Sequence, residues 1–285
     1  MKQESIIGVD LGGTTVDSGL IKNSNIEKIF SLNISAEKSE LDILKQVIQT
    51  IENVYVESVA GIGIGVPGLI NVEKGIVYNL QNIPSWQEVH LKEKLENHFG
   101  VPVYFNNDAN CLAAGVKYFG IGKESRNLAG LALGTGMGTG VIIDGKLYSG
   151  SHGGAGEFGM IPYRDHNYEY YCSGQFFKTE YEISGKDLYN KAKKDDKKAL
   201  RIFEIFGGHL GKAITAILYA FDPEMIVLGG SVSKAYWFFK KSMQREIDAF
   251  KFTPVLDRFT IKVNKIPNIA VLGAAALYLD SKKRA

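Results

Sequence analysis

The sequence has little of what cross-links a small secreted domain. Only two cysteines occur, Cys111 and Cys172, far apart and in no CxxC pattern. They therefore imply neither a disulfide framework nor a cysteine-based zinc site. We expect both to be reduced thiols in a cytoplasmic protein.

Long apolar runs and an excess of one charge are also absent. No secretory signal core follows the first residues, MKQES, and no run approaches the roughly 18 apolar residues of a membrane span. The formal net charge is +2. The densest basic run, KAKKDDKK at 191–198, is interrupted by two aspartates and indicates a solvated helix face or loop. We expect no membrane and no nucleic-acid partner.

Two common nucleotide-binding motifs are missing as well. No GxxxxGK[ST] sequence occurs, which excludes a P-loop as an ATP site. Gly63, Gly65 and Gly68 satisfy GxGxxG, but residues 69–78 look extended, whereas the dinucleotide motif requires a helix at its third glycine. We therefore reject that match.

What is present is an alternation of strand and helix patterns over 285 residues, a length that suggests two domains. Strands next to helices indicate an α/β class with mixed sheets. Helices are expected at 37–54, 87–99, 109–118, 199–221, 233–250 and 269–279, and strands at 16–21, 25–33, 59–66, 103–105, 225–228 and 259–263.

The stretch GVDLGGTTV, residues 8–16, has the pattern of a strand, a tight turn and a strand. Because Gly12 and Gly13 lack a Cβ, the turn can adopt positive φ and an anion can approach its N–H groups closely. Thr14 and Thr15 add hydroxyl donors, and Asp10 can hold a hydrated Mg²⁺ against phosphate oxygens. This indicates a phosphate-binding turn, with a plain glycine-rich hairpin as the alternative.

A second stretch repeats this pattern. Residues 130–143, GLALGTGMGTGVII, match residues 8–21 at Gly130, Leu133, Gly134 and Ile143. The common order of strand, glycine turn and strand, near the start of each half of the chain, indicates an internal structural duplication. We expect the two turns to hold a polyphosphate between them.

Asp108 stands where the expected strand 103–105 leads into the expected helix 109–118. The helix dipole and free N–H groups favour a carboxylate there, so capping and a chemical role are both open.

Seven short motifs occur in a fixed order: DLGGTT, VPG, NIPSW, NNDAN, LGTGMGTG, GAGEFG and VLGGS. In this order they resemble the ROK family (repressor, open reading frame, kinase) of sugar kinases, within the superfamily of actin, hexokinase and heat-shock chaperones. The resemblance implies an α/β fold of two ribonuclease-H-like, actin-like ATPase lobes around a cleft, and a homodimer. We expect an N-terminal lobe of residues 1–118 with the returning helix 269–285, and a C-terminal lobe of residues 119–268.

The resemblance also implies roles for individual residues. The implied catalytic base is Asp108. The implied sugar-binding residues are Gly68, Asn82, Asn107, Glu157 and Glu180. The implied nucleotide-binding residues are Asp10, Gly12, Gly13, Thr14, Thr15, Gly134, Thr135, Gly136, Gly138, Gly229 and Gly230.

The implied reaction is the phosphorylation of a hexose by ATP, with Mg²⁺ carried by the nucleotide, and glucose giving glucose 6-phosphate is the first expectation. Phosphoryl transfer needs alignment and charge neutralisation more than covalent chemistry. Asp108 would accept the proton of the attacking hydroxyl.

The chain departs from the family where typical members bind structural zinc. The family histidine is Met160, and the cysteine positions fall on Tyr171, Ser173 and Lys178, with Cys172 out of register. These residues cannot build a tetrahedral zinc site, so we predict none. Residues 163–171 are expected to form a surface excursion. Because the histidine usually contacts sugar, an N-acetylmannosamine, N-acetylglucosamine or fructose kinase stays an alternative.

Other functions and residues carry less weight. A sugar-binding regulator of the same family would have a helix-turn-helix ahead of the first turn, and nine residues precede Asp10 here, so we treat it as a remote alternative. His152 and His209 are expected to be hydrogen-bonded rather than metal ligands. The aromatic residues 236–239 are expected to pack in a core on one side, with a subunit interface as the alternative.

Overall fold

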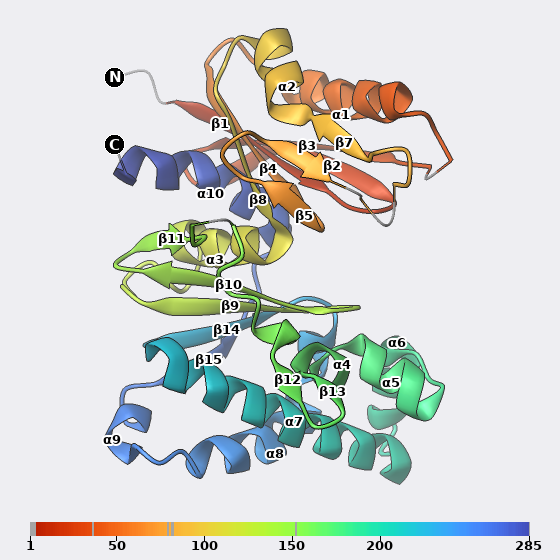
Figure 1. Ribbon diagram of the computed structural model, residues 1–285, viewed down its shortest axis with the longest axis vertical. Coiled ribbons are helices and arrows are strands. Elements are labelled where there is room, and N and C mark those ends of the chain that lie inside the picture. Colours follow the sequence, from red (N-terminus) through yellow and green to blue (C-terminus); the bar gives the residue numbers. More distant parts are fainter. Residues whose placement is uncertain (1–3, 36, 79, 81–82, 152, 285) are drawn as a thin grey trace. The chain divides into compact units, whose positions relative to one another are not determined.

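A computed structural model, drawn in Figure 1, describes residues 4–35, 37–78, 80, 83–151 and 153–284. The chain divides into two compact units. The first contains residues 1–124, 145–155 and 266–285, and the second contains residues 125–144 and 156–265. The lobes expected from the sequence place 145–155 in the C-terminal lobe, whereas this segment clusters with the first unit.

The first unit is built on a five-stranded sheet with the order β3-β2-β1-β4-β8. β1 pairs antiparallel with β2 and parallel with β4, and β4 pairs parallel with β8. The sheet strands are β1 (Ser5–Leu11), β2 (Thr15–Lys22), β3 (Asn25–Asn33), β4 (Val59–Val66) and β8 (Val103–Asn107). A smaller sheet contains β5 (Leu69–Asn71), β6 (Ile76–Tyr78) and β7 (Glu88–His90). The helices are α1 (Glu40–Val54), α2 (Leu91–Phe99), α3 (Asp108–Phe119) and α10 (Ile269–Arg284).

Helices cover both faces of the first sheet (Figure 1). α1 buries Ile43, Val47 and Ile51 against one face, which is the i, i+4 spacing of one helix side. α10 approaches the other face closely, because a Cβ at Gly8 or Gly63 would overlap its backbone. The C-terminal helix therefore packs on the sheet built from the N-terminal part of the chain.

The second unit is built on a sheet with the order β11-β10-β9-β14-β15. Its strands are β9 (Leu128–Leu133), β10 (Met137–Ile143), β11 (Lys146–Tyr148), β14 (Met225–Gly229) and β15 (Thr260–Val263), and a short hairpin adds β12 (Pro162–Tyr163) and β13 (His166–Asn167). The helices are α4 (Tyr168–Cys172), α5 (Gly174–Tyr181), α6 (Gly185–Ala192), α7 (Lys197–Phe221), α8 (Tyr236–Asp248) and α9 (Thr253–Leu256), with 3₁₀ turns at Phe158–Met160 and Val232–Ala235.

In the second unit α7 and α8 lie on one face of the sheet (Figure 1). A Cβ at Gly207 or Gly211 of α7 would overlap α8, so these glycines permit close packing of the two helices. Phe203, Phe206 and Phe239 are fully buried between them. The expected one-sided core of residues 236–239 is confirmed, since Phe239 is buried while Trp237 is 76% exposed.

The expected duplication is confirmed by topology. In both main sheets an antiparallel hairpin, β1–β2 or β9–β10, continues into two parallel strands, β4–β8 or β14–β15. This order occurs with only four identities in fourteen aligned residues of the repeated stretch. The fold class is the expected α/β class.

Several expected element bounds were wrong. Residues 88–90 form strand β7 rather than the start of a helix, and α2 begins at Leu91. α1 begins at Glu40 because Ser39 caps it, accepting a hydrogen bond from the Asp42 N–H. α8 begins at Tyr236 after a 3₁₀ turn, and α10 extends to Arg284. The sequence reading missed α4, α5 and α6.

Candidate active site

Three adjacent parallel strands of the first unit end at the same sheet edge. In the strand register Asp10 of β1 pairs with Gly65 of β4, and Val66 of β4 pairs with Asn107 of β8. Asp108 follows directly as the first residue of α3. The carboxyl ends of parallel strands are the usual ligand-binding edge of α/β sheets. The register therefore brings Asp10, Asn107 and Asp108 to one edge, as the sequence predicted for a site.

Asn107, rather than Asp108, caps α3. The Asn107 side chain accepts a hydrogen bond from the Asn110 N–H at 2.7 Å. Asp108 accepts from the adjacent Ala109 N–H at 2.8 Å, and it is exposed. The capping interpretation of Asp108 was therefore wrong. Because Asn107 uses its oxygen as the cap, its amide NH₂ is the group that can meet a ligand.

A buried asparagine network holds this strand end. Asn106 Oδ1 accepts hydrogen bonds from the Asn110 amide and from the Asn107 N–H, and the Asn106 amide donates to Ser149 Oγ at 3.0 Å. Both Asn106 and Asn110 are buried. The sequence reading overlooked Asn106, although its place in the NNDAN run was the available signal. The network fixes the backbone from which Asp108 projects.

The first glycine turn connects β1 to β2. Gly12 N–H donates to the Thr15 carbonyl at 2.8 Å, and the Thr14 carbonyl accepts from Ile34 N–H at 2.8 Å. Neither Gly12 nor Gly13 has a positive φ, so the expected left-handed conformation does not occur. Thr14 is exposed, and Gly12, Gly13 and Thr15 are half-buried. The turn remains open to an anion because its residues are small.

Burial and two neighbouring carboxylates act on Asp10 at this edge. The pKa of Asp10 is raised to about 6, first by burial and then by the charges of Asp17 and Asp108. Burial also raises the pKa of Asp108 above its ordinary value, since surrounding protein displaces water although part of the side chain is exposed, and the Ala109 N–H partly opposes this shift. A raised pKa makes a carboxylate a better proton acceptor.

The chemistry of Asp10 fits a magnesium ion that arrives with a nucleotide. No basic side chain forms an ion pair with Asp10, Asp17 or Asp108 in the described part of the chain. Among the same residues no group of three or more His, Cys, Asp or Glu is arranged to hold a metal ion. One carboxylate with nucleotide phosphates and water is the usual Mg²⁺ environment.

The second glycine turn joins β9 to β10 in the second unit. Gly134 N–H donates to the Gly136 carbonyl at 3.0 Å, which closes a turn around exposed Thr135. The Gly134 carbonyl accepts from Gly174 N–H, at the start of α5, at 2.7 Å. The turn is therefore held both by its own backbone and by a neighbouring helix.

Gly229 and Gly230 lie beside this turn. In the register Gly229 of β14 pairs with Ala132 of β9. Gly230 has φ +82, and a Cβ there would overlap the Leu133 carbonyl. Only glycine can adopt this conformation at such close approach without strain. The structure thus brings together the second turn and the Gly229–Gly230 turn, as expected for one nucleotide-binding edge.

Glu157 lies between two glycines packed on β10. A Cβ at Gly156 would overlap the Thr139 carbonyl, and a Cβ at Gly159 would overlap the Met137 carbonyl. Glu157 itself is exposed at the start of the 3₁₀ turn Phe158–Met160. The GEFG segment is therefore pressed against the strand that contains Gly138. Asn82 lies outside the described residues, as does His152, and Gly68 follows β4 with φ +87.

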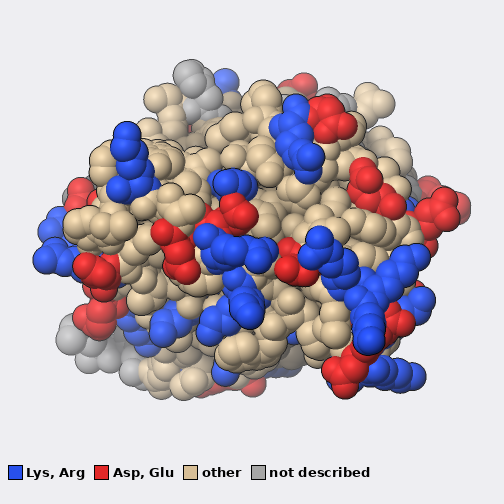
Figure 2. Space-filling view, turned by 90° about the horizontal axis from the view of Figure 1, so that it is seen from below, with Lys and Arg blue, Asp and Glu red and all other residues tan. Residues whose placement is uncertain are grey.

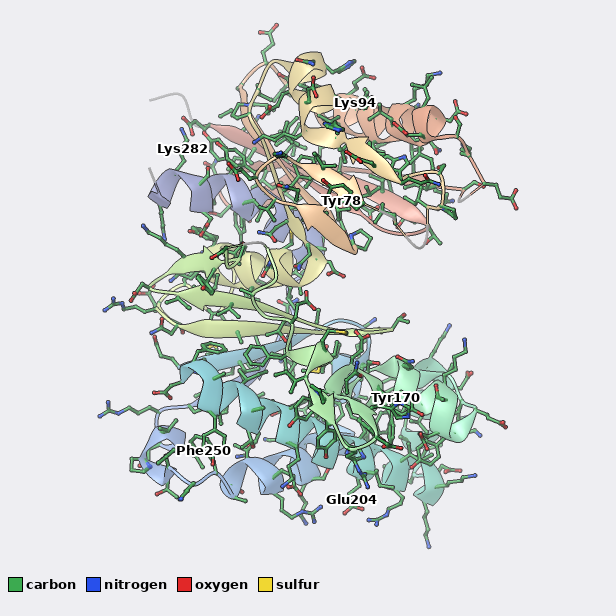
Figure 3. All side chains as sticks on the ribbon, in the orientation of Figure 1. Tyr78, Lys94, Tyr170, Glu204, Phe250 and Lys282 are labelled. Atoms are coloured by element: carbon green, nitrogen blue, oxygen red, sulfur yellow. The ribbon has the colours of Figure 1, made fainter. Side chains whose placement is uncertain are left out.

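Glu180 is held by a tyrosine. The Tyr170 hydroxyl donates to Glu180 Oε1 at 2.5 Å, and this bond is the main reason that the pKa of Tyr170 is raised. Figure 3 labels Tyr170, which belongs to α4, whereas Glu180 belongs to α5. No local pattern indicates this pair, because the two residues are ten positions apart in a stretch that we did not predict as helical.

The segment expected as a surface excursion is partly core. Tyr171 is 7% exposed, and Tyr163 stacks on Tyr168 with ring centroids 4.5 Å apart. The Tyr163 hydroxyl lies 3.2 Å from His209 Nδ1, which confirms His209 as a hydrogen-bonded helix residue. Met160, at the family histidine position, is 49% exposed. Aromatic packing therefore organises the segment after Met160.

A cavity of about 650 Å³ opens in the first unit beside edge strand β8. Its lining includes Tyr78, Asn106, Ser149 and Asp280. The lining contains none of the described residues that the sequence assigned to the sugar or the nucleotide. It therefore does not define the site.

Among the described residues no helix combines the length and the hydropathy of a membrane span. On the face shown in Figure 2, Lys and Arg side chains are interspersed with Asp and Glu.

Comparisons with known proteins agree with this geometry. The chain is 27% identical to a glucokinase of Thermotoga maritima, over 97% of this chain and 98% of that protein. It is 30% identical to a xylose repressor of Bacillus subtilis, over 77% of this chain and 61% of the repressor. A Streptomyces griseus ROK family glucokinase, solved with glucose and AMPPNP, superimposes with a TM-score of 0.77 at 26% identity, over 96% of this chain and 98% of that one. The ROK family model matches residues 6–281, so the chain belongs to the ROK family.

Proposed function

We propose that this protein is an ATP-dependent sugar kinase that phosphorylates glucose at its 6-hydroxyl. The observation that carries the proposal is the pair of topologically equivalent glycine turns, one beside Asp10 and Asp108, the other beside Gly229 and Gly230. Similarity to glucokinases over nearly the whole chain supports this activity.

In the proposed mechanism Asp108 accepts the proton of the attacking sugar hydroxyl. Its raised pKa suits this role, because a stronger base removes the proton more readily as the oxygen attacks the γ-phosphate. The Asn107 amide and the residues at Gly68, Glu157 and Glu180 would orient the sugar. Orientation of this kind lowers the barrier by fixing the reacting groups before the reaction.

The nucleotide would be bound mainly by small residues and backbone. N–H groups of the turns at 12–15 and 134–136 would face phosphate oxygens, with Gly138 allowing close approach, and the Gly229–Gly230 turn would pass the adenosine. Mg²⁺ bound with ATP would neutralise the charge that develops during transfer. Asp10 would hold its water shell, and the positive charge would offset the cost of a buried ionised carboxylate.

A coupled assay of ADP release tests the proposal. Purified protein is given ATP and, in turn, glucose, fructose, N-acetylmannosamine and N-acetylglucosamine, and the phosphorylated position is identified by NMR. We expect the highest kcat/KM with glucose and phosphate on the 6-oxygen. Absence of turnover with every sugar would refute the kinase proposal.

The main alternative is another sugar of the same reaction class. Where typical members have a histidine, Met160 is 49% exposed, and its side chain would give the sugar site a more apolar wall than a histidine does. An N-acetyl group or a ketose would meet that wall differently from glucose. A higher kcat/KM for one of these sugars would replace glucose in the proposal and leave the mechanism unchanged.

Assembly and location stay predictions. The exposed indole of Trp237 on α8 is a candidate for a homodimer contact. Analytical ultracentrifugation of the protein and of a Trp237→Ser variant would test it. A cytoplasmic location is still expected from the sequence.

A further inference from the structure

Helix α4 presents one carboxylate to the second glycine turn. Glu169 Oε2 accepts a hydrogen bond from the Met137 N–H at 2.9 Å, at the point where the turn enters β10. The same carboxylate occupies the space that a side chain at residue 136 would need, since a Cβ on Gly136 would overlap it. Glu169 is half-buried, so the bond is partly shielded from water.

This contact is one of two that tie the turn to neighbouring helices. Gly174 N–H, at the start of α5, donates to the Gly134 carbonyl. Glu169 therefore holds the exit of the turn and Gly174 holds its entry, on the two sides of Thr135. The backbone bond between Gly134 and Gly136 closes the turn but anchors it to nothing else.

We propose that Glu169 is a positioning residue for nucleotide binding: its carboxylate fixes the turn at residues 134–136 in the conformation that receives the phosphates. This inference rests on the proposed function, which makes the turn a phosphate site. A glycine turn has many accessible conformations, and ordering it in advance removes that entropic cost from binding. Glycine at position 136 thus has two explanations: a side chain there would overlap the Glu169 carboxylate, and it would also keep a phosphate from approaching the backbone.

A competing effect is electrostatic. A carboxylate close to bound phosphates would repel them, and its removal would then strengthen ATP binding. Positioning and repulsion predict opposite changes in the KM for ATP. The two effects are separated by replacing the carboxylate once with a neutral acceptor and once with no acceptor.

Glu169→Gln keeps an oxygen that can accept from the Met137 N–H, whereas Glu169→Ala removes it. We expect the KM for ATP to rise about 10-fold or more in Glu169→Ala and to stay within about 3-fold of the parent value in Glu169→Gln. The KM for the sugar should change little in either variant. Asp257→Ala, which removes an exposed carboxylate elsewhere in the second unit, is the charge control and should leave both KM values unchanged.

A lower KM for ATP in both Glu169 variants would overturn the proposal in favour of repulsion. Equal rises in both KM values would show a general loss of structure, and unchanged values would show that the contact does not matter for binding. Either result also overturns the proposal.

Amide hydrogen exchange on the ligand-free protein tests the anchor without using activity. A peptide covering residues 131–141 should exchange faster in Glu169→Ala than in the parent or in Glu169→Gln, while peptides from the first unit should not change. If no sugar is phosphorylated but this difference is found, the proposed function fails and the anchor stands. If the sugar is phosphorylated and exchange is the same in all variants, the anchor fails alone.

Discussion

The two units have the same sheet topology but stabilise their glycine turns differently. The first turn is held by backbone bonds within its own sheet, from Gly12 to Thr15 and from Ile34 to Thr14. The second turn is held from outside, by Glu169 of α4 and Gly174 of α5. The duplicated hairpin thus keeps its strand order while the groups around it have changed.

The charges beside the turns differ as well. Beside the first turn, burial and then the charges of Asp17 and Asp108 raise the pKa of Asp10, which suits proton and cation chemistry. The second turn has glycines and a threonine, and the adjacent carboxylate of Glu169 accepts a hydrogen bond from a backbone N–H. This comparison suggests a division of work in which the first unit supplies the base and the second supplies neutral donors.

Removal of the proposed base from the first unit should reduce activity most. Asp108→Asn keeps the volume and an oxygen for the Ala109 N–H but cannot accept the hydroxyl proton. We expect kcat to fall about 10²- to 10⁴-fold, with the dissociation constant for sugar changed little. ADP release measures the first quantity and isothermal titration calorimetry the second. Unchanged turnover would mean that Asp108 is not the base and that the division of work fails.

The next effect concerns how each unit packs its helices. Gly63→Ala would push α10 from the first sheet, and Gly207→Ala would separate α7 from α8. Each should lower the free energy of unfolding by about 1–3 kcal/mol, measured by chemical denaturation, because the Cβ meets backbone that cannot move aside. In hydrogen exchange, amide protection should fall mainly in the unit that carries the substitution.

Gly154→Ala is the control for these packing variants. Gly154 has no atom within 4 Å of an added Cβ and no positive φ, so its free energy of unfolding should change little. A loss in both units from either packing substitution would show that the units unfold together.

The third effect uses the electrostatic difference between the turns. The pKa of Asp10 is about 6 in the folded protein against an ordinary value of 3.8, so the folded state binds the proton more tightly. The contribution of Asp10 to folding stability is then complete below pH 3.8 and is lost as pH rises through about 6. After a discount for partial exposure, Asp10→Asn should stabilise the ligand-free protein at pH 8 by about 1–2 kcal/mol.

Thermal melting at pH 8 and pH 4 checks this result, since the gain should nearly vanish at pH 4, where the parent carboxyl is protonated. A gain of equal size at both pH values would assign the effect to packing rather than charge. The same variant should weaken ATP binding in the presence of Mg²⁺. Asp10 would then be a residue that lowers the stability of the ligand-free protein but is needed for nucleotide binding.

The sequence alone was sufficient for the parts of the fold that follow from local pattern. The apolar runs of β1, β4 and β14 and the spacing in α1 and α7 predicted their elements, and the two glycine stretches predicted the duplicated hairpin. Those signals are strong because each element buries one continuous face or run.

The remainder depended on contacts between distant residues. No local pattern indicates that Glu169 would meet Met137, which lies 32 positions away. The cap of α3 is a local contact, but the adjacent Asn107 and Asp108 are residue types of similar capping preference. The short helices α4, α5 and α6 lie in an aromatic and polar stretch without a clear period, and they are stabilised by packing around Tyr171 and Phe176. Tertiary contact overrides weak local preference in such segments.

His209, a histidine of the second unit, should have a smaller influence on folding stability, and its pH dependence differs from that of Asp10. Burial, and secondarily the charge of Arg164, lowers the pKa of His209 below its ordinary 6.5, so the unfolded chain binds the proton more tightly. Stability from this group is complete above pH 6.5 and is lost as pH falls below it, which is opposite in sign to the contribution of Asp10. Tyr163→Phe, which removes the hydroxyl beside His209 Nδ1, should cost about 0.5–1.5 kcal/mol at pH 7.5. Thermal melting is compared between pH 7.5 and pH 5. We expect His209→Gln to reduce the loss of stability on acidification, whereas Asp10→Asn should leave that loss unchanged. Identical pH profiles for the two variants would contradict the assignment of opposite charge effects to the two units.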